Sequence, residues 1–321
     1  MNKILVILLG VIAMLLVSCS KDSETPEGLT TPPPGGSNWF YSGQWGHSGS
    51  GAGEFNQPNG ITLAPNGKIY VADTYNHRIQ FFTAEGSYLS GWGSHGAGDT
   101  QFSVPNGIAA APNSNLYIAD EENHRVSCYN QYGSFIGQWG TYGSGNGQFK
   151  HPQGVTVAPN YTVYVADTQN NRIQYFTISG SYMGQWNSGG NAITSLNGPR
   201  GVAVAPNGDI YVTDTQNSRV QYFTDTGSYL GKWGSHGNSN SQFILPSGIV
   251  VANDGSVLVS DWGNNRIQQF SATGSYLGQW GSYGSSNGQF SGPYGLAFNS
   301  DSYRVYVADG LNCRIQYFDQ D

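Results

Sequence analysis

The sequence predicts an all-β protein in which six four-stranded antiparallel blades form a closed β-propeller. Three observations lead to this fold. An Asp recurs six times at a nearly constant spacing, a Trp series keeps the same spacing, and short β-branched runs alternate with turn residues between them. Helix-type periodicity is missing after the first twenty residues. Self-similarity at a fixed period of about 20 to 50 residues indicates a repeat architecture.

One repeat is about 47 residues long and supplies four expected strands. In the first copy we expect these strands over residues 58–64, 68–72, 78–82 and 87–92. Pro65-Asn66-Gly67 separates the first two strands, and Asn-Gly favours a tight hairpin because it tolerates positive φ. Four antiparallel strands in a repeat of this length are typical of a propeller blade.

The ends of the chain predict how the ring closes. Five Trp residues end the fourth strands of successive copies, and Trp45 keeps their spacing although no blade precedes it. The last copy stops at Phe318-Asp319-Gln320-Asp321, without a fourth strand of its own. We therefore expect the N-terminal segment around residues 38–46 to complete the last blade, which removes an exposed edge strand.

The amino terminus predicts export and membrane anchoring. Lys3 precedes an apolar run that ends at Val17, so residues 1–18 are expected to be a signal peptide. Leu16-Val17-Ser18-Cys19 resembles the bacterial lipobox, which predicts lipidation of Cys19 after cleavage. Residues 19–38 are rich in Pro, Gly and Ser and are expected to be a flexible tether to the propeller of residues 39–321. Ser20 follows the Cys, and by resemblance to bacterial lipoproteins this favours the outer membrane, with the domain facing the periplasm or the cell surface.

Charge argues against nucleic acid as a partner. From residue 39 onward the chain has 11 Lys and Arg against 17 Asp and Glu. Six of the Arg belong to the repeat, and the other cations are scattered over five blades. Binding to nucleic acid needs a continuous basic footprint, so we expect no nucleic-acid partner. We also expect the propeller to be monomeric.

The repeat also resembles a known family. Residues 71–79 read Val-Ala-Asp-Thr-Tyr-Asn-His-Arg-Ile, and residues 118–126 repeat the pattern with Glu-Glu at the two variable positions. This pattern is similar to the NHL repeat, and the resemblance extends over residues 39–321. It implies a six-bladed propeller. For function it implies binding of protein or RNA, while relatives of the fold include lyases and lactonases.

Every copy carries an Asp followed five residues later by an Arg. We expect these pairs to be structural, because a catalytic site rarely needs six copies whereas a blade corner needs one each time. The pairs are Asp73/Arg78, Asp120/Arg125, Asp167/Arg172, Asp214/Arg219, Asp261/Arg266 and Asp309/Arg314.

Positions that vary between copies are better candidates for a ligand site. One lies between Pro and Gly at the start of each innermost strand and is expected at the mouth of the central channel. It reads Asn59, Asn106, Gln153, Arg200, Ser247 and Tyr294. The loops on the same face vary as well, and Tyr75, Glu122 and Trp262 are the candidates there. Polar amides, aromatic rings and one Arg suit a protein, peptide or glycan ligand.

Catalysis is the alternative function. His77 and His124 share a repeat position, but two imidazoles are too few for a zinc site. The amidating-lyase relatives place several His around the channel, whereas His47, His95, His151 and His236 are expected here in connections between blades. We therefore expect no catalytic residue, metal or cofactor. A metal-dependent lyase or lactonase-like hydrolase with a site at the channel remains the second possibility.

Overall fold

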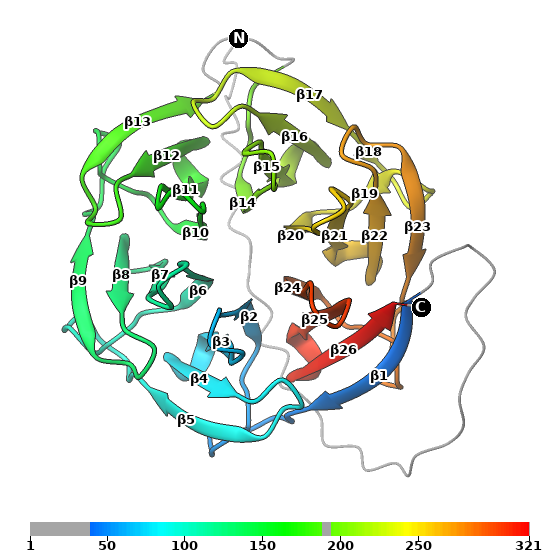
Figure 1. Ribbon diagram of the computed structural model, residues 1–321, viewed down its shortest axis with the longest axis horizontal. Helices are drawn as coiled ribbons and strands as arrows, with labels where there is room; N and C mark the ends of the chain where they lie inside the picture. The colour runs from blue at the N-terminus through cyan, green and yellow to red at the C-terminus, as the bar shows by residue number, and fades with distance from the viewer. Residues whose placement is uncertain (1–38, 188–193, 321) are drawn as a thin grey trace, which may run out of the picture.

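The computed structural model describes residues 39–187 and 194–320, which form a closed ring of six four-stranded antiparallel sheets (Figure 1). The predicted signal peptide, Cys19 and the tether lie outside the described residues. Within the described part of the chain, no helix is long and apolar enough to cross a membrane. The predicted fold class is confirmed.

Each blade begins at the central channel and ends at the perimeter. The innermost strands are β2 (Pro58–Leu63), β6 (Pro105–Ala110), β10 (Pro152–Val157), β14 (Pro199–Val204), β20 (Pro246–Val251) and β24 (Pro293–Asn299). The second strands are β3 (Ile69–Asp73), β7 (Leu116–Asp120), β11 (Val163–Asp167), β15 (Ile210–Asp214), β21 (Val257–Asp261) and β25 (Arg304–Asp309). These strands define blades 1 to 6 in chain order.

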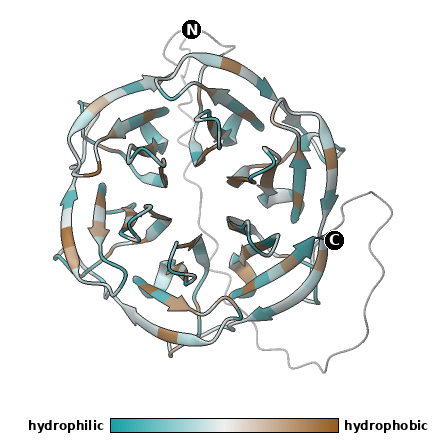
Figure 2. Cartoon of the chain, viewed as in Figure 1, coloured by the Kyte–Doolittle hydropathy of each residue, from teal (hydrophilic) through white to brown (hydrophobic). Residues whose placement is uncertain are grey.

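The outer half of each blade follows the same order. The third strands are β4 (Arg78–Phe82), β8 (Arg125–Tyr129), β12 (Arg172–Phe176), β16 (Arg219–Phe223), β22 (Arg266–Phe270) and β26 (Arg314–Gln320). The fourth strands are β5 (Tyr88–Trp92), β9 (Phe135–Trp139), β13 (Tyr182–Asn187), β17 (Tyr229–Trp233), β23 (Tyr276–Trp280) and β1 (Trp39–Trp45). Bands of hydrophobic and hydrophilic residues alternate along these outermost strands (Figure 2), as expected for a sheet with one face buried.

Short helical turns join the second and third strands in five blades. They are η1 (Thr74–Asn76), η2 (Thr168–Asn170), η3 (Thr215–Asn217), η4 (Trp262–Asn264) and η5 (Gly310–Asn312). A turn over residues 121–124 takes their place in blade 2. A two-strand parallel pair, β18 (Ser235–His236) and β19 (Gln242–Phe243), lies in the connector that leads into blade 5.

The N-terminal strand closes the ring as predicted. β1 pairs antiparallel with β26, from Trp39 opposite Gln320 to Trp45 opposite Ile315, so the two ends of the described chain meet in blade 6 (Figure 1). Trp39 also stacks on Trp280 at 5.3 Å between ring centroids. Its indole N–H donates to the side-chain oxygen of Gln269 at 3.1 Å, which ties blade 6 to blade 5.

Buried tyrosines connect the other five pairs of neighbouring blades. The second strands of five blades carry a Tyr that is almost inaccessible to solvent and whose hydroxyl donates to a backbone carbonyl of the following blade's outer turn, as Tyr117 does to Ile178 at 3.0 Å. Blade 5 has Leu258 at this position. In blade 6 the third strand is β26 and the fourth is β1, which come from opposite ends of the described residues, so within these residues no turn joins them and blade 5 has no equivalent carbonyl to use.

A Gly in each innermost strand lets neighbouring blades meet at the axis. A Cβ at Gly60 would collide with the carbonyl oxygen of Asn106, and one at Gly154 with that of Arg200. Only a residue without a side chain permits this approach of backbone to backbone. The residue before each of these glycines is thereby held at the channel.

Candidate functional site

The repeated Asp and Arg form an ion pair in all six blades. In each pair Arg Nε lies 2.6–2.8 Å from Asp Oδ2, and each Asp is inaccessible to solvent. The two residues face each other in the register of the second and third strands, as Asp167 faces Arg172. The strand pairing therefore places the charges together without help from any ligand.

The contacts around each pair explain its recurrence. In blade 3 the Asp167 carboxylate also accepts hydrogen bonds from the Asn170 amide, the Gln174 amide and the backbone N–H of Lys150. The Arg172 guanidinium donates onward to backbone carbonyls of the connector before the blade, including that of Gln148 at 2.8 Å. These contacts fasten the Gly-rich connector to the blade, which is a structural task needed once per repeat.

The six variable positions of the innermost strands converge on the channel. Asn106, Gln153, Arg200, Ser247 and Tyr294 line a cavity of about 80 Å³ on the axis. Asn59 occupies the same strand position, and its side-chain oxygen faces Gly310 of blade 6. Because Pro58 pairs with Asp73 and Pro105 with Asp120, this end of each inner strand lies beside the loop between the second and third strands. We call this side of the ring the mouth face.

These side chains form one polar network across the channel. Tyr294 Oη donates to Gln153 Oε1 at 3.2 Å, from blade 6 to blade 3. The Arg200 guanidinium lies 6.0 Å from the centre of the Tyr294 ring and donates to Ser247 Oγ at 3.3 Å. Burial raises the pKa of Tyr294 to about 12, so its hydroxyl stays protonated and donates at neutral pH. The network spans the axis around this small cavity, and we call it the channel floor.

Glu121 joins this network from the loop of blade 2. Its two oxygens accept hydrogen bonds from the Asn106 amide at 2.8 Å and the Gln153 amide at 2.9 Å. The side chain is 12% exposed, and burial raises the pKa of its carboxyl group. Glu121 is one of the variable loop residues in the sequence, although it was not among the predicted site residues. The available signal was that Thr74, Thr168 and Thr215 stand at its position in other blades.

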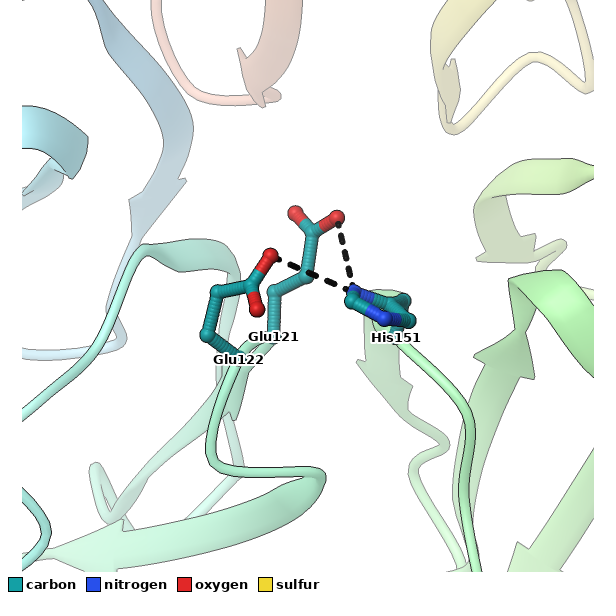
Figure 3. Close-up of side chains that lie close together, drawn as sticks. All are labelled: Glu121, Glu122 and His151. Carbon is teal, nitrogen blue, oxygen red and sulfur yellow. Dashed lines mark ion pairs between the residues drawn. The ribbon is translucent and has the colours of Figure 1, made fainter. Parts of the chain in front are cut away.

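Glu121, Glu122 and His151 form a compact cluster at the mouth face. His151 Nδ1 lies 3.3 Å from Glu122 Oε1 and 3.8 Å from Glu121 Oε1. Figure 3 shows both carboxylates directed toward the imidazole from one loop, while His151 comes from the entry of the next blade. Glu122 was a predicted site residue. His151 was expected only as part of a connector, and that view was incomplete, because the ring of blades brings the connector against the neighbouring loop.

The other predicted residues are spread over the mouth face. Tyr75 is half-buried, and burial together with Glu121 and Glu122 raises its pKa, which places it beside the cluster. Trp262 is half-buried in blade 5, where its indole nitrogen lies against the backbone of Gly292. The cluster and Trp262 therefore belong to separate parts of the mouth face.

His77 and His124 accept hydrogen bonds from backbone N–H groups in this structure. Nδ1 of His77 accepts a hydrogen bond from the Val104 N–H at 3.2 Å, and Nδ1 of His124 accepts one from the His151 N–H at 3.3 Å. Burial, with a further contribution from His95, lowers the pKa of His77. In two other blades the oxygens of Asn171 and Asn265 accept the equivalent backbone bond.

Comparison with known proteins identifies the repeat. The NHL repeat model matches residues 55–82, 102–129, 149–176, 196–223 and 243–270. The B-box type zinc finger protein ncl-1 of Caenorhabditis elegans is 43% identical over 49 residues. That stretch is 15% of this chain and 6% of ncl-1, so the chain spans only a small part of this relative.

Solved structures agree on the fold. A gluconolactonase from Xanthomonas campestris superposes with a TM-score of 0.64 at 14% identity, over 91% of this chain and 99% of that one. A catalytically inactive virginiamycin B lyase from Staphylococcus aureus, solved with quinupristin, superposes with a TM-score of 0.61 at 15% identity, over 92% of this chain and 99% of that one. A Bacteroides thetaiotaomicron protein of unknown function superposes with a TM-score of 0.66 at 16% identity, over 86% of this chain and 74% of that one. At such identities the likeness extends to the fold alone. The repeat matches place this chain in the NHL-repeat family, and its fold is a six-bladed β-propeller.

Proposed function

We propose that this propeller is a non-catalytic binding module that holds a protein, peptide or glycan against its mouth face. The observation that carries the proposal is the polar network on the axis, where five of the six blades contribute different side chains to one cavity. The fold alone would be satisfied by the same residue in every blade. Tyr, Trp and Arg, which are enriched at binding hot spots, all occur on this face.

The structure suggests where a ligand would be held. Arg200 offers guanidinium hydrogen bonds at the channel floor, and Trp262 offers a large half-buried ring at the rim. An aromatic surface and a charged donor suit both peptides and sugars. The acidic balance of the domain makes an anionic polymer a poor partner.

Capture of ligands by the purified domain of residues 39–321 tests this function. The immobilised wild type is compared with an Arg200→Ala, Trp262→Ala double variant in envelope extracts and on a glycan array. Lys68→Ala is the matched control, because it removes a cation from the turn on the opposite face. We expect a partner that the wild type and the control retain and the double variant loses. Equal capture by all three proteins would move the site elsewhere.

A second function is a metal-dependent lyase or lactonase-like hydrolase. The observation that favours it is the cluster of Glu121, Glu122 and His151 at the mouth of the channel. The solved structures named above include a lyase and a gluconolactonase, although they share the fold only. Turnover of lactone or cyclic-ester substrates that Glu122→Gln abolishes would favour this function over simple binding.

We also propose that the domain is exported and lipid-anchored through Cys19. The support is the pattern Leu16-Val17-Ser18-Cys19 after a short apolar run. Metabolic labelling with a fatty acid, compared between the wild type and Cys19→Ala, tests this anchor. We expect label in the outer-membrane fraction of the wild type only, and label retained by Cys19→Ala would contradict the proposal.

A further inference from the structure

We propose that Glu121, Glu122 and His151 bind one divalent transition-metal cation of the Zn²⁺ type. One ligand atom from each residue can be chosen so that all three lie within 4.8 Å of one another. Ligands of a bound Zn²⁺ at about 2.0–2.2 Å are separated from one another by about 3–4 Å. The observed 3.3 and 3.8 Å from His151 Nδ1 to the two carboxylates already fall in that range.

The charge of the cluster is incompletely balanced by protein groups. Among the residues that the structure describes, neither carboxylate forms an ion pair with a Lys or Arg, and His151 is their shared partner. Two carboxylates held close together disfavour each other's ionisation. A divalent cation would compensate both carboxylates at once.

The repeat shows that Glu121 is not required by the fold. In blades 3 and 4 the residue at this position is Thr, and its hydroxyl donates to the carbonyl of the next blade's Pro, from Thr168 to Pro199 at 2.8 Å and from Thr215 to Pro246 at 2.7 Å. A carboxylate cannot donate that hydrogen bond when ionised. Blade 2 therefore lacks the hydroxyl-to-carbonyl bond of blades 3 and 4 and has the bond from the Gln153 amide to Glu121 in its place. The fold accounts for a contact between blades here but not for the choice of a carboxylate, and a ligand role provides that reason.

A second, independent observation concerns Asn106. Its side chain is 3% exposed, lines the channel cavity and donates to Glu121, but its Oδ1 has no hydrogen-bond partner in the described structure. Buried acceptors without a donor are rare in folded proteins and call for an explanation. A cation-bound water beside Glu121 would supply the missing donor. The amides of Asn106 and Gln153 meanwhile orient Glu121, as outer-shell groups do in metal sites.

The ligand set indicates the class of cation. Imidazole nitrogen favours Zn²⁺ and its first-row neighbours, whereas Mg²⁺ and Ca²⁺ prefer sites made of oxygen alone. Three protein ligands leave coordination positions open, and Glu122, 48% exposed, lies where the site meets solvent. The site would therefore hold a cation that can also contact a ligand on the mouth face.

Calorimetric titration of the untagged, chelator-treated domain of residues 39–321 with Zn²⁺ tests this site without reference to any partner. We expect one equivalent to bind and the melting temperature to rise with Zn²⁺ concentration. Glu121→Thr, Glu122→Gln and His151→Asn should each weaken binding by about 10- to 100-fold or more. The variants are chosen to fold. Thr is the residue of other blades, Glu122 is exposed, and Asn tolerates the φ of 50° at His151.

His47→Gln is the matched control. His47 Nε2 lies 3.2 Å from Glu54 Oε1, so this exposed pair has the same chemistry as the cluster but only two ligands. The control should bind Zn²⁺ as the wild type does. The proposal is overturned if the wild type binds no Zn²⁺, if it binds only Ca²⁺ or Mg²⁺, or if His47→Gln weakens binding as much as His151→Asn. Because the readout is metal binding alone, failure here leaves the proposed partner binding intact.

Discussion

Tyr294 in blade 6 donates a hydrogen bond to Gln153 in blade 3, across the full width of the channel. The two residues are 141 positions apart, which is three repeats and half of the ring. Gln153 passes the connection to Glu121 of blade 2. The channel floor is therefore a set of side chains that brace opposite blades.

Tyr294→Phe should lower the free energy of unfolding by about 0.5–1.5 kcal/mol, because the ring stays while the bond to Gln153 is lost. Urea unfolding followed by tryptophan fluorescence measures this change. Tyr303→Phe is the control, since Tyr303 is 54% exposed in the turn before β25 and should change stability little. Equal stability of Tyr294→Phe and the wild type would mean that the brace contributes nothing.

Arg172→Ala should destabilise the protein by about 3–5 kcal/mol, because it leaves the Asp167 carboxylate buried and unpaired. Arg304→Ala provides a comparison at the surface, where Asp319 is 37% exposed, and should cost only about 1 kcal/mol. The loss in the free energy of unfolding of each variant is measured by denaturant unfolding at one pH. Similar losses for the two variants would show that the blade corner is no more sensitive than this partly exposed pair.

Removal of residues 39–45 should make unfolding less cooperative and should promote oligomers, because β26 loses its partner and becomes an exposed edge. Light scattering after size exclusion and scanning calorimetry detect both effects. A chain that begins at residue 39 is the control and should stay monomeric. A monomeric deletion variant with the melting curve of that control would refute closure by β1 as a source of stability.

The stability of the protein should fall with acidification in part through His77. Burial lowers the pKa of His77 in the folded state, so the unfolded chain binds more protons below about pH 6.5. The contribution of His77 is therefore complete above that pH and is lost as the pH falls toward the folded pKa.

His77→Asn isolates this contribution. Asn accepts the same backbone hydrogen bond in blades 3 and 5 and tolerates the φ of 53° found here. In urea unfolding at pH 7.5 and 5.5, the variant should lose less stability on acidification than the wild type does. His77→Ala should have a lower free energy of unfolding than the wild type at both pH values, because the Val104 N–H loses its acceptor. Identical acid sensitivity of the wild type and His77→Asn would exclude His77 as the titrating group.

Local pattern was sufficient to predict the blades. The spacing from Asp73 to Asp309 gives six repeats, and the unpaired position of Trp45 predicts the closing strand found in blade 6. The Asp–Arg ion pairs follow from strand register, because a tight turn of four residues places the two residues opposite each other. The strands and the ion pairs depend on neighbours in the chain, and the closing strand follows from the count of repeats, so the sequence alone determined them.

Contacts between blades were decided by the tertiary structure. His151 meets Glu121 and Glu122 only because the connector of blade 3 passes the loop of blade 2, and Tyr294 meets Gln153 only because six blades form a ring narrow enough for their side chains to touch. Leu258 looks like simple variation until the missing turn of blade 6 explains it. These contacts depend on ring diameter, side-chain length and the position of the chain ends, and a repeat period encodes none of them.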